Sequence, residues 1–137
     1  MAKRVLVVDD HAPTRTLIRT ILESEKAGTY EVVEAATGTD CLKAADSKGP
    51  FDLILLDVNL PDMDGYDICR AIRHVDKEVP ILFVTARSEM KDYTAGRDAG
   101  GDSYIVKPIA RASLRSLVAL FTGLGRRGAT KPEPSGT

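Results

Sequence analysis

The sequence predicts an α/β protein in which one parallel sheet is covered by helices on both faces. Short runs of β-branched and other apolar residues alternate along the chain with longer stretches of helical periodicity. The strand-like runs are apolar at nearly every position, which is typical of strands buried on both sides. Strands that alternate with helices in this way favour right-handed crossovers and a single parallel sheet.

The first part of the chain contains two predicted strands, each followed by a helix. Val5–Val8 is an unbroken apolar run, and Pro13 suits the first turn of the next helix. Gly28 ends that helix, and Tyr30–Ala35 is the second strand. The segment Thr37–Asp40 resembles a capping box and begins the second helix.

The middle of the chain repeats this alternation twice. Phe51–Leu56 is the third strand, and it follows a Gly-Pro pair that breaks the preceding helix. Asp64 precedes the third helix as a capping residue, with Asp62 as a turn residue before it. Pro80–Thr85 is the fourth strand, and the helix predicted over Ser88–Ala99 has only a weak apolar stripe.

The last predicted strand and helix complete the domain. Gly100 and Gly101 supply a tight turn before the short strand Ser103–Val106. Leu114, Leu117, Val118 and Phe121 then recur at helical spacing. Beyond them the composition changes to Gly, Arg, Pro and Ser, so we expect a domain over 1–123 and a flexible tail or linker over 124–137.

Composition excludes several classes of protein. The 137 residues suit one domain, and a formal net charge of -1 gives no electrostatic reason to bind nucleic acid or an anionic membrane directly. No apolar run is long enough for a signal peptide or a membrane span. Cys41 and Cys69 are isolated, which favours buried free thiols in a reducing compartment, so we expect a cytoplasmic protein.

Reactive side chains follow several of the predicted strands. Asp9 and Asp10 follow the first strand, Asp57 follows the third, Thr85 ends the fourth and Lys107 follows the fifth. The carboxyl ends of parallel strands meet at one edge, so these groups are expected to converge. Three carboxylates against one ammonium leave two negative charges. A hard divalent cation that prefers oxygen ligands would neutralise them, which predicts Mg²⁺, with Mn²⁺ as the alternative.

The motifs VVDD, LLDVNLPDMDG, FVTAR and IVKP, in this order, resemble the receiver domains of bacterial two-component response regulators. The resemblance covers about residues 3–122. The receiver domains that the chain resembles are of the chemotaxis-regulator-like kind. It implies a flavodoxin-like (βα)5 doubly wound sandwich with strand order 2-1-3-4-5. It also implies a cis peptide bond at Lys107-Pro108.

The resemblance implies a role for each site residue. Asp57 would be the phosphoacceptor, taking a phosphoryl group from a sensor histidine kinase or a histidine phosphotransfer protein. Asp9, Asp10 and Asp57, together with the backbone carbonyl of Asn59, would hold the metal ion. The partner kinase and the downstream target are not identified by the sequence.

The remaining site residues would act on the phosphoryl group or respond to it. Lys107 would neutralise phosphoryl oxygens, and Thr85 would donate its hydroxyl. Inward movement of Thr85 would vacate space for Tyr104, the aromatic switch position. Asn59 and Arg87 would tune the rate of hydrolysis. The switch would alter the face made by the fourth helix, fifth strand and fifth helix and so control an output domain or target protein.

Two other functions are weighed against this one. Haloacid-dehalogenase-like phosphohydrolases need Asp-x-Asp, whereas Asn59 stands at the second acidic position, so an enzyme that turns over a separate substrate is not expected. A receiver would catalyse only its own phosphorylation and dephosphorylation. A phosphorylation-independent receiver-like interaction module is the alternative, and it should lack one of the site groups.

Overall fold

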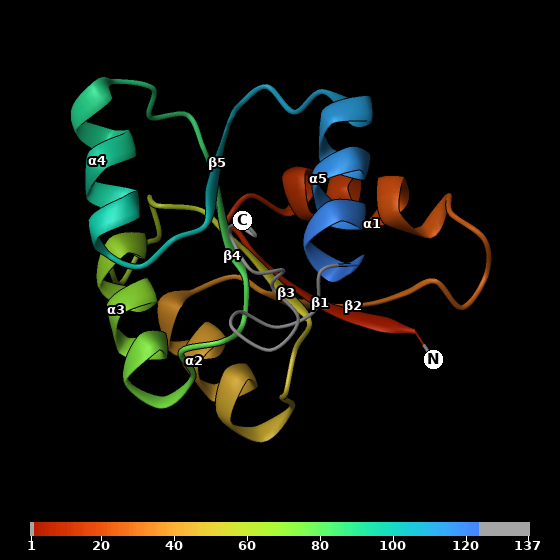
Figure 1. Cartoon of the computed structure of the whole chain (residues 1–137), viewed down its shortest axis with the longest axis horizontal. Helices are drawn as coiled ribbons and strands as arrows, with labels where there is room; N and C mark the ends of the chain where they lie inside the picture. Colours follow the sequence, from red (N-terminus) through yellow and green to blue (C-terminus); the bar gives the residue numbers. More distant parts are fainter. Residues whose placement is uncertain (1, 124–137) are drawn as a thin grey trace, which may run out of the picture.

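The structure is a computed structural model that describes residues 2–123 and has the predicted architecture (Figure 1). One sheet of five parallel strands runs in the order β2-β1-β3-β4-β5, which confirms the predicted strand order. The strands are β1 Lys3–Val8, β2 Tyr30–Ala35, β3 Leu53–Leu56, β4 Ile81–Thr85 and β5 Ser103–Val106. The helices are α1 Ala12–Glu23, α2 Gly38–Ser47, α3 Gly65–Val75, α4 Met90–Asp98 and α5 Arg111–Gly123.

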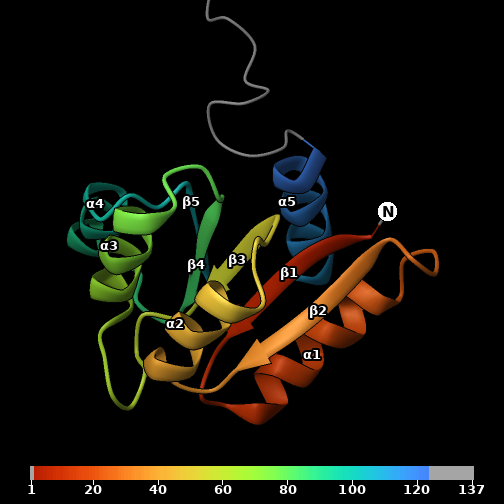
Figure 2. The same ribbon diagram turned by 90° about the horizontal axis from the view of Figure 1, so that it is seen from below.

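Two apolar cores lie on opposite faces of the sheet. Helices α1 and α5 cover one face, and α2, α3 and α4 cover the other (Figures 1 and 2). Successive strand residues point to opposite faces. In β1, Leu6 and Val8 therefore enter the core under α2 and α3, whereas Val5 and Val7 enter the core under α1 and α5. This double burial explains why the central strands are continuous apolar runs.

Several element boundaries differ from those predicted. Strand β3 begins at Leu53, two residues later than expected, because the Asp52 carboxylate accepts a hydrogen bond from the Arg4 amide before the ladder starts. Strand β4 begins at Ile81, since Pro80 has no amide hydrogen to contribute to a ladder. Helix α4 spans only Met90–Asp98 and begins with a capping box between Glu89 and Asp92.

Other local predictions are confirmed. Cys41 and Cys69 are free and buried, and burial raises the pKa of the Cys41 thiol to about 12. The Lys107-Pro108 bond is cis, and Gly100 has a φ of 106°, as a tight turn there requires.

Among residues 2–123, none of the helices has the length and apolar character that crossing a membrane would need. The predicted tail, 124–137, lies outside the described residues.

Candidate functional site

Three carboxylates meet at the carboxyl edge of the sheet. Asp9 and Asp10 follow β1, and Asp57 follows β3, its direct neighbour in the sheet. Each offers an oxygen atom within 4.8 Å of the others. Asp9 and Asp57 are only 2% and 5% exposed, whereas Asp10 is exposed to solvent. The parallel topology thus brings together side chains that are far apart in the sequence, as predicted.

Lys107 bridges the two buried carboxylates from the end of β5. Its Nζ lies 2.7 Å from Asp9 Oδ2 and 3.1 Å from Asp57 Oδ2. Burial by itself lowers the pKa of the Lys107 ammonium, but its hydrogen bonds to Asp9 and Asp57 outweigh burial and leave this pKa above the ordinary value. Lys107 is therefore positively charged at neutral pH and offsets part of the repulsion between the acids.

Backbone amides supply further hydrogen bonds to the same carboxylates. The His11 amide donates to Asp9 Oδ1 at 2.9 Å, and the Asn59 amide donates to Asp57 Oδ1 at 3.2 Å. Each buried carboxylate therefore accepts hydrogen bonds from an ammonium and from a backbone amide, which offset the cost of burying a polar group.

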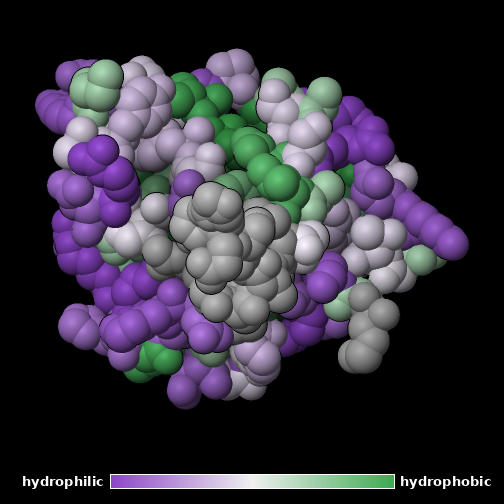
Figure 3. All heavy atoms as spheres, viewed as in Figure 1, coloured by the Kyte–Doolittle hydropathy of each residue, from purple (hydrophilic) through white to green (hydrophobic). Residues whose placement is uncertain are grey.

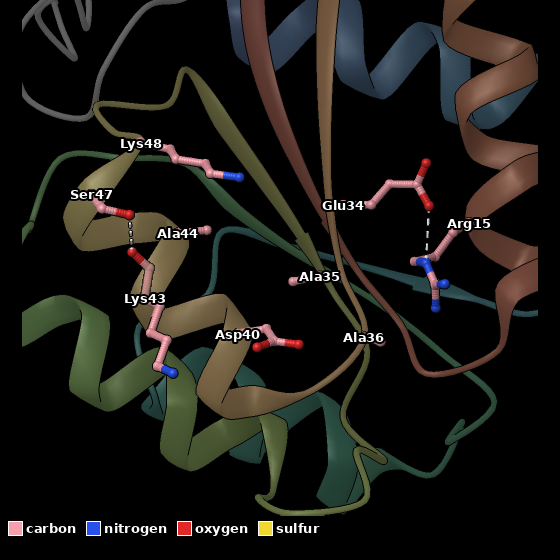
Figure 4. A pocket seen from close by; sticks show the side chains of 9 residues that line it. All are labelled: Arg15, Glu34, Ala35, Ala36, Asp40, Lys43, Ala44, Ser47 and Lys48. Carbon is pink, nitrogen blue, oxygen red and sulfur yellow. Dashed lines mark hydrogen bonds and ion pairs between the residues drawn. The ribbon is translucent and has the colours of Figure 1, made fainter.

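Arg15 of α1 is hydrogen-bonded to the loop after β1, a contact that the sequence did not predict. Its Nη1 donates to the Asp9 carbonyl oxygen at 2.6 Å, and its Nε donates to Glu34 Oε1 at 2.9 Å. Figure 4 shows Arg15 and Glu34 facing each other beside a cavity of about 380 Å³ that is bounded on its other side by α2. Asp9, Asp10 and Asp57 do not line this cavity, so the cavity is separate from the site that these three carboxylates form.

Arg87 joins the loops that follow β3 and β4. Its Nε and Nη2 donate to Asn59 Oδ1 at 2.9 and 2.7 Å. The guanidinium also lies 3.7 Å from the Asp64 carboxylate and 5.8 Å from the centre of the Tyr66 ring. The two predicted rate-tuning residues, Asn59 and Arg87, are therefore in direct contact beside the acidic cluster.

Thr85 and Tyr104 have hydrogen-bond partners other than the three carboxylates. The Thr85 side chain is fully buried, and its hydroxyl accepts a hydrogen bond from the Arg87 amide at 3.4 Å. The Tyr104 hydroxyl is paired with that of Tyr66 at 3.0 Å. Within residues 2–123, neither hydroxyl forms a hydrogen bond with Asp57.

The loop between Asp57 and α3 is tied down at two points. Asp64 caps α3 as predicted, accepting from the Tyr66 amide at 2.8 Å. Asp62 accepts from the amides of Gly38 and Thr39 at 2.7 and 2.9 Å and from the Thr39 hydroxyl at 2.7 Å, so it caps α2. The sequence predicted only a turn residue at Asp62, because nothing in its local pattern indicates a partner 23 residues away.

The donor set of the cluster fits a hard cation. Asp9, Asp10 and Asp57 offer only oxygen atoms, and with Lys107 they leave two negative charges that a divalent ion could balance. The site could therefore hold a metal ion. A carboxylate at the position of Asp57 could also act as a nucleophile, since an ionised carboxylate needs no general base.

Comparisons with known proteins agree with this geometry. The family model for the response regulator receiver domain matches residues 5–119. The chain is 37% identical over 134 residues to the transcriptional regulatory protein PrrA of Mycobacterium tuberculosis and 40% identical over 133 residues to the response regulator MprA of Mycobacterium bovis. These matches cover 98% and 97% of this chain but only 55% and 54% of the relatives, so the chain spans about half of their length.

Solved structures show the same fold. A CheY-like receiver domain protein from Methanospirillum hungatei superposes with a TM-score of 0.83 at 29% identity, covering 90% of this chain and 95% of that one. The chemotaxis response regulator CheY4 of Vibrio cholerae gives 0.80 at 32% identity, with coverages of 88% and 99%. The chain belongs to the response regulator receiver domain family and is a phosphoacceptor signalling domain.

Proposed function

We propose that Asp57 is the phosphoacceptor of this receiver. One observation carries the proposal: the Asp57 carboxylate is buried at the end of β3, beside two further carboxylates and 3.1 Å from the Lys107 ammonium. A carboxylate held there can attack phosphorus while the ammonium compensates the charge that gathers on the phosphoryl oxygens.

The proposed reaction is a transfer from a phosphohistidine of a sensor kinase or a phosphotransfer protein. A bond forms between an Asp57 oxygen and phosphorus, the bond from phosphorus to the histidine nitrogen breaks, and the imidazole leaves with the electron pair and takes up a proton. The acyl phosphate is later hydrolysed. The receiver thus catalyses only its own phosphorylation and dephosphorylation, and it has no separate substrate to turn over.

Asp9, Asp10 and Asp57 would hold Mg²⁺, or Mn²⁺ in its place, together with the backbone carbonyl of Asn59. When bound, the ion would supply positive charge next to the phosphoryl oxygens. The mixture of buried and exposed carboxylates supports this assignment, because Mg²⁺ keeps several of its waters and Asp10 faces solvent. Lys107 and the Thr85 hydroxyl would then contact the phosphoryl group, and the contact between Arg87 and Asn59 would affect the rate of hydrolysis.

The signal would leave through the face formed by α4, β5 and α5, with Thr85 and Tyr104 as the switch. Figure 3 shows apolar side chains gathered between α4 and α5, and Met90, Tyr93 and Leu120 are exposed on these helices. We propose that this face controls an output domain or target protein, with residues 1–123 as the receiver and 124–137 as a linker. The receiver itself would not contact nucleic acid. PrrA, a relative about twice as long, is named a transcriptional regulatory protein, and we propose that any DNA contacts of such a protein would lie outside the part that this chain matches.

The test is intact-mass measurement after incubation with acetyl phosphate, with and without Mg²⁺. The expected result is a gain of one phosphoryl group that requires Mg²⁺ and is absent in Asp57→Asn. The matched control is Asp67→Asn, which alters an exposed acid on the outside of α3. No mass gain in any condition would refute the proposal and favour the phosphorylation-independent module.

A further inference from the structure

Two tyrosine hydroxyls form a directed chain of hydrogen bonds between α3, α4 and β5. Tyr66 lies in the first turn of α3 and is only 6% exposed. Its hydroxyl donates to the Asp92 carbonyl oxygen of α4 at 3.1 Å and lies 3.0 Å from the Tyr104 hydroxyl of β5. Each hydroxyl has one hydrogen, and a carbonyl can only accept. Tyr104 must therefore be the donor to Tyr66.

The surroundings make this chain energetically significant. Phe83 packs edge-on against Tyr66, with ring centres 5.2 Å apart, and its ring centre lies 5.9 Å from that of Tyr104. Burial, followed by the hydrogen bond to Tyr66, raises the pKa of the Tyr104 hydroxyl. If the Tyr104 hydroxyl lost its partner in this position, water would be a poor substitute for that partner. The hydrogen bond to Tyr66 therefore favours the observed orientation of Tyr104.

Tyr66 is also connected to the acidic site. It directly follows Gly65, where a side chain would collide with the Asp57 carbonyl group, so the start of α3 is pressed against the phosphoacceptor position. The Arg87 guanidinium lies 5.8 Å from the Tyr66 ring centre while it is bonded to Asn59. A shift of the loop after β3 would therefore displace Tyr66.

We propose that Tyr66 is a positioning residue for the switch: its hydroxyl holds Tyr104 turned toward α3 and α4, and it links the orientation of Tyr104 to the loop that carries Asp57. The proposal rests on the proposed switch role of Tyr104. It adds a second path to the one through Thr85, because Tyr66 is hydrogen-bonded both to Asp64 in the loop after β3 and to Asp92 of α4. A purely structural role would predict lower stability without a change in the orientation of Tyr104.

The experiment uses the full chain with 3-fluorotyrosine at its four tyrosines, since ¹⁹F NMR then gives one signal per site. In Tyr66→Phe the ring stays but the acceptor is lost. Loss of the acceptor should lower about tenfold the ratio of molecules with Tyr104 turned toward α3 and α4 to molecules with Tyr104 turned away from them. We therefore expect the Tyr104 signal to move and its solvent isotope shift to increase. The reciprocal variant Tyr104→Phe should move the Tyr66 signal. Tyr93→Phe is the matched control, because its ring centre lies 4.7 Å from that of Tyr104 and its hydroxyl is not bonded to Tyr104 within residues 2–123.

An unchanged Tyr104 signal in Tyr66→Phe, or an equal change in Tyr93→Phe, would overturn the proposal. A second arm adds acetyl phosphate and Mg²⁺ and follows both the mass and the Tyr104 signal. The phosphorylation-induced movement of that signal should differ between Tyr66→Phe and the unaltered chain, and an identical movement would remove the link to Asp57. Failure of the mass gain itself would refute the proposed function, whereas the spectra recorded without acetyl phosphate would still decide whether Tyr66 holds Tyr104.

Discussion

Replacing Lys107 with methionine should destabilise the fold through the acids it leaves behind. The ammonium lies 2.7 Å from Asp9 and 3.1 Å from Asp57, whose side chains are 2% and 6% exposed. At an effective dielectric constant of about 20, each ion pair is worth roughly 5–6 kcal/mol before desolvation is subtracted. Removing one partner of a buried pair costs about 3–5 kcal/mol. Because Lys107 keeps 23% of its side-chain exposure, we expect a loss at the lower end, about 3 kcal/mol.

Urea unfolding at neutral pH in the presence of EDTA measures this loss. Lys91→Met is the matched control: Lys91 is 77% exposed and its Nζ is 3.9 Å from Glu89, so its free energy of unfolding should change by less than about 1 kcal/mol. In saturating Mg²⁺ the deficit of Lys107→Met should shrink. Without the ammonium the acids should bind the cation more tightly than in the unaltered chain, so the folded variant gains more stability from it. Equal unfolding free energies for Lys107→Met and the unaltered chain in EDTA would show that the bridge does not hold the two acids together.

The raised pKa of Lys107 also fixes the pH range of this contribution. A raised folded-state pKa gives stability that is fully present below the unfolded-state value of 10.5 and is lost as pH rises through the folded-state value. The difference between the unaltered chain and Lys107→Met should therefore persist through neutral pH and decline only in strongly alkaline solution.

Two further predictions concern the loop between Asp57 and α3. Hydrogen bonds from Thr39 and Gly38 lower the pKa of Asp62 from 3.8 to about 2. The contribution of Asp62 to stability is therefore present above pH 3.8 and is lost as the pH falls toward 2. The urea midpoints of Asp62→Asn and the unaltered chain should differ at about pH 5 and converge near pH 2. Gly65→Ala would bring a methyl group into the Asp57 carbonyl and should lower the free energy of unfolding by about 1–3 kcal/mol; thermal unfolding of this variant at an unchanged midpoint would contradict that packing.

The sheet and the acidic cluster could be predicted because both follow from short-range patterns and one topological rule. A strand buried on both faces must be apolar at consecutive positions, so the runs Val5–Val8 and Phe51–Leu56 predict strands without knowledge of their neighbours, although β3 itself begins at Leu53. Once the strands are parallel, their carboxyl ends share one edge, and the acids after β1 and β3 must meet there.

The contacts between loops and helices could not be predicted in the same way. Arg15 reaches the Asp9 carbonyl because the first turns of α1 lie beside the end of β1, and Asp62 reaches α2 because that helix begins opposite the loop. Both contacts depend on how helices are placed on the sheet, which periodicity does not determine. The late start of β3 has a similar cause, since the hydrogen bond from the Arg4 amide to Asp52 joins β1 to the residue just before β3.

The pairing of Tyr66 with Tyr104 shows why a switch is harder to read than a site. Asp57 and Lys107 meet at one edge because β3 and β5 belong to the same parallel sheet, with only β4 between them, so their meeting survives small changes in packing. The two tyrosine hydroxyls meet only if α3 and β5 are rotated so that 3.0 Å separates the atoms at the ends of two long side chains. A contact with so little tolerance is made or broken by small displacements, whereas the bridge between Lys107 and the buried acids can absorb them. That difference in tolerance is what a conformational switch needs beside a rigid site.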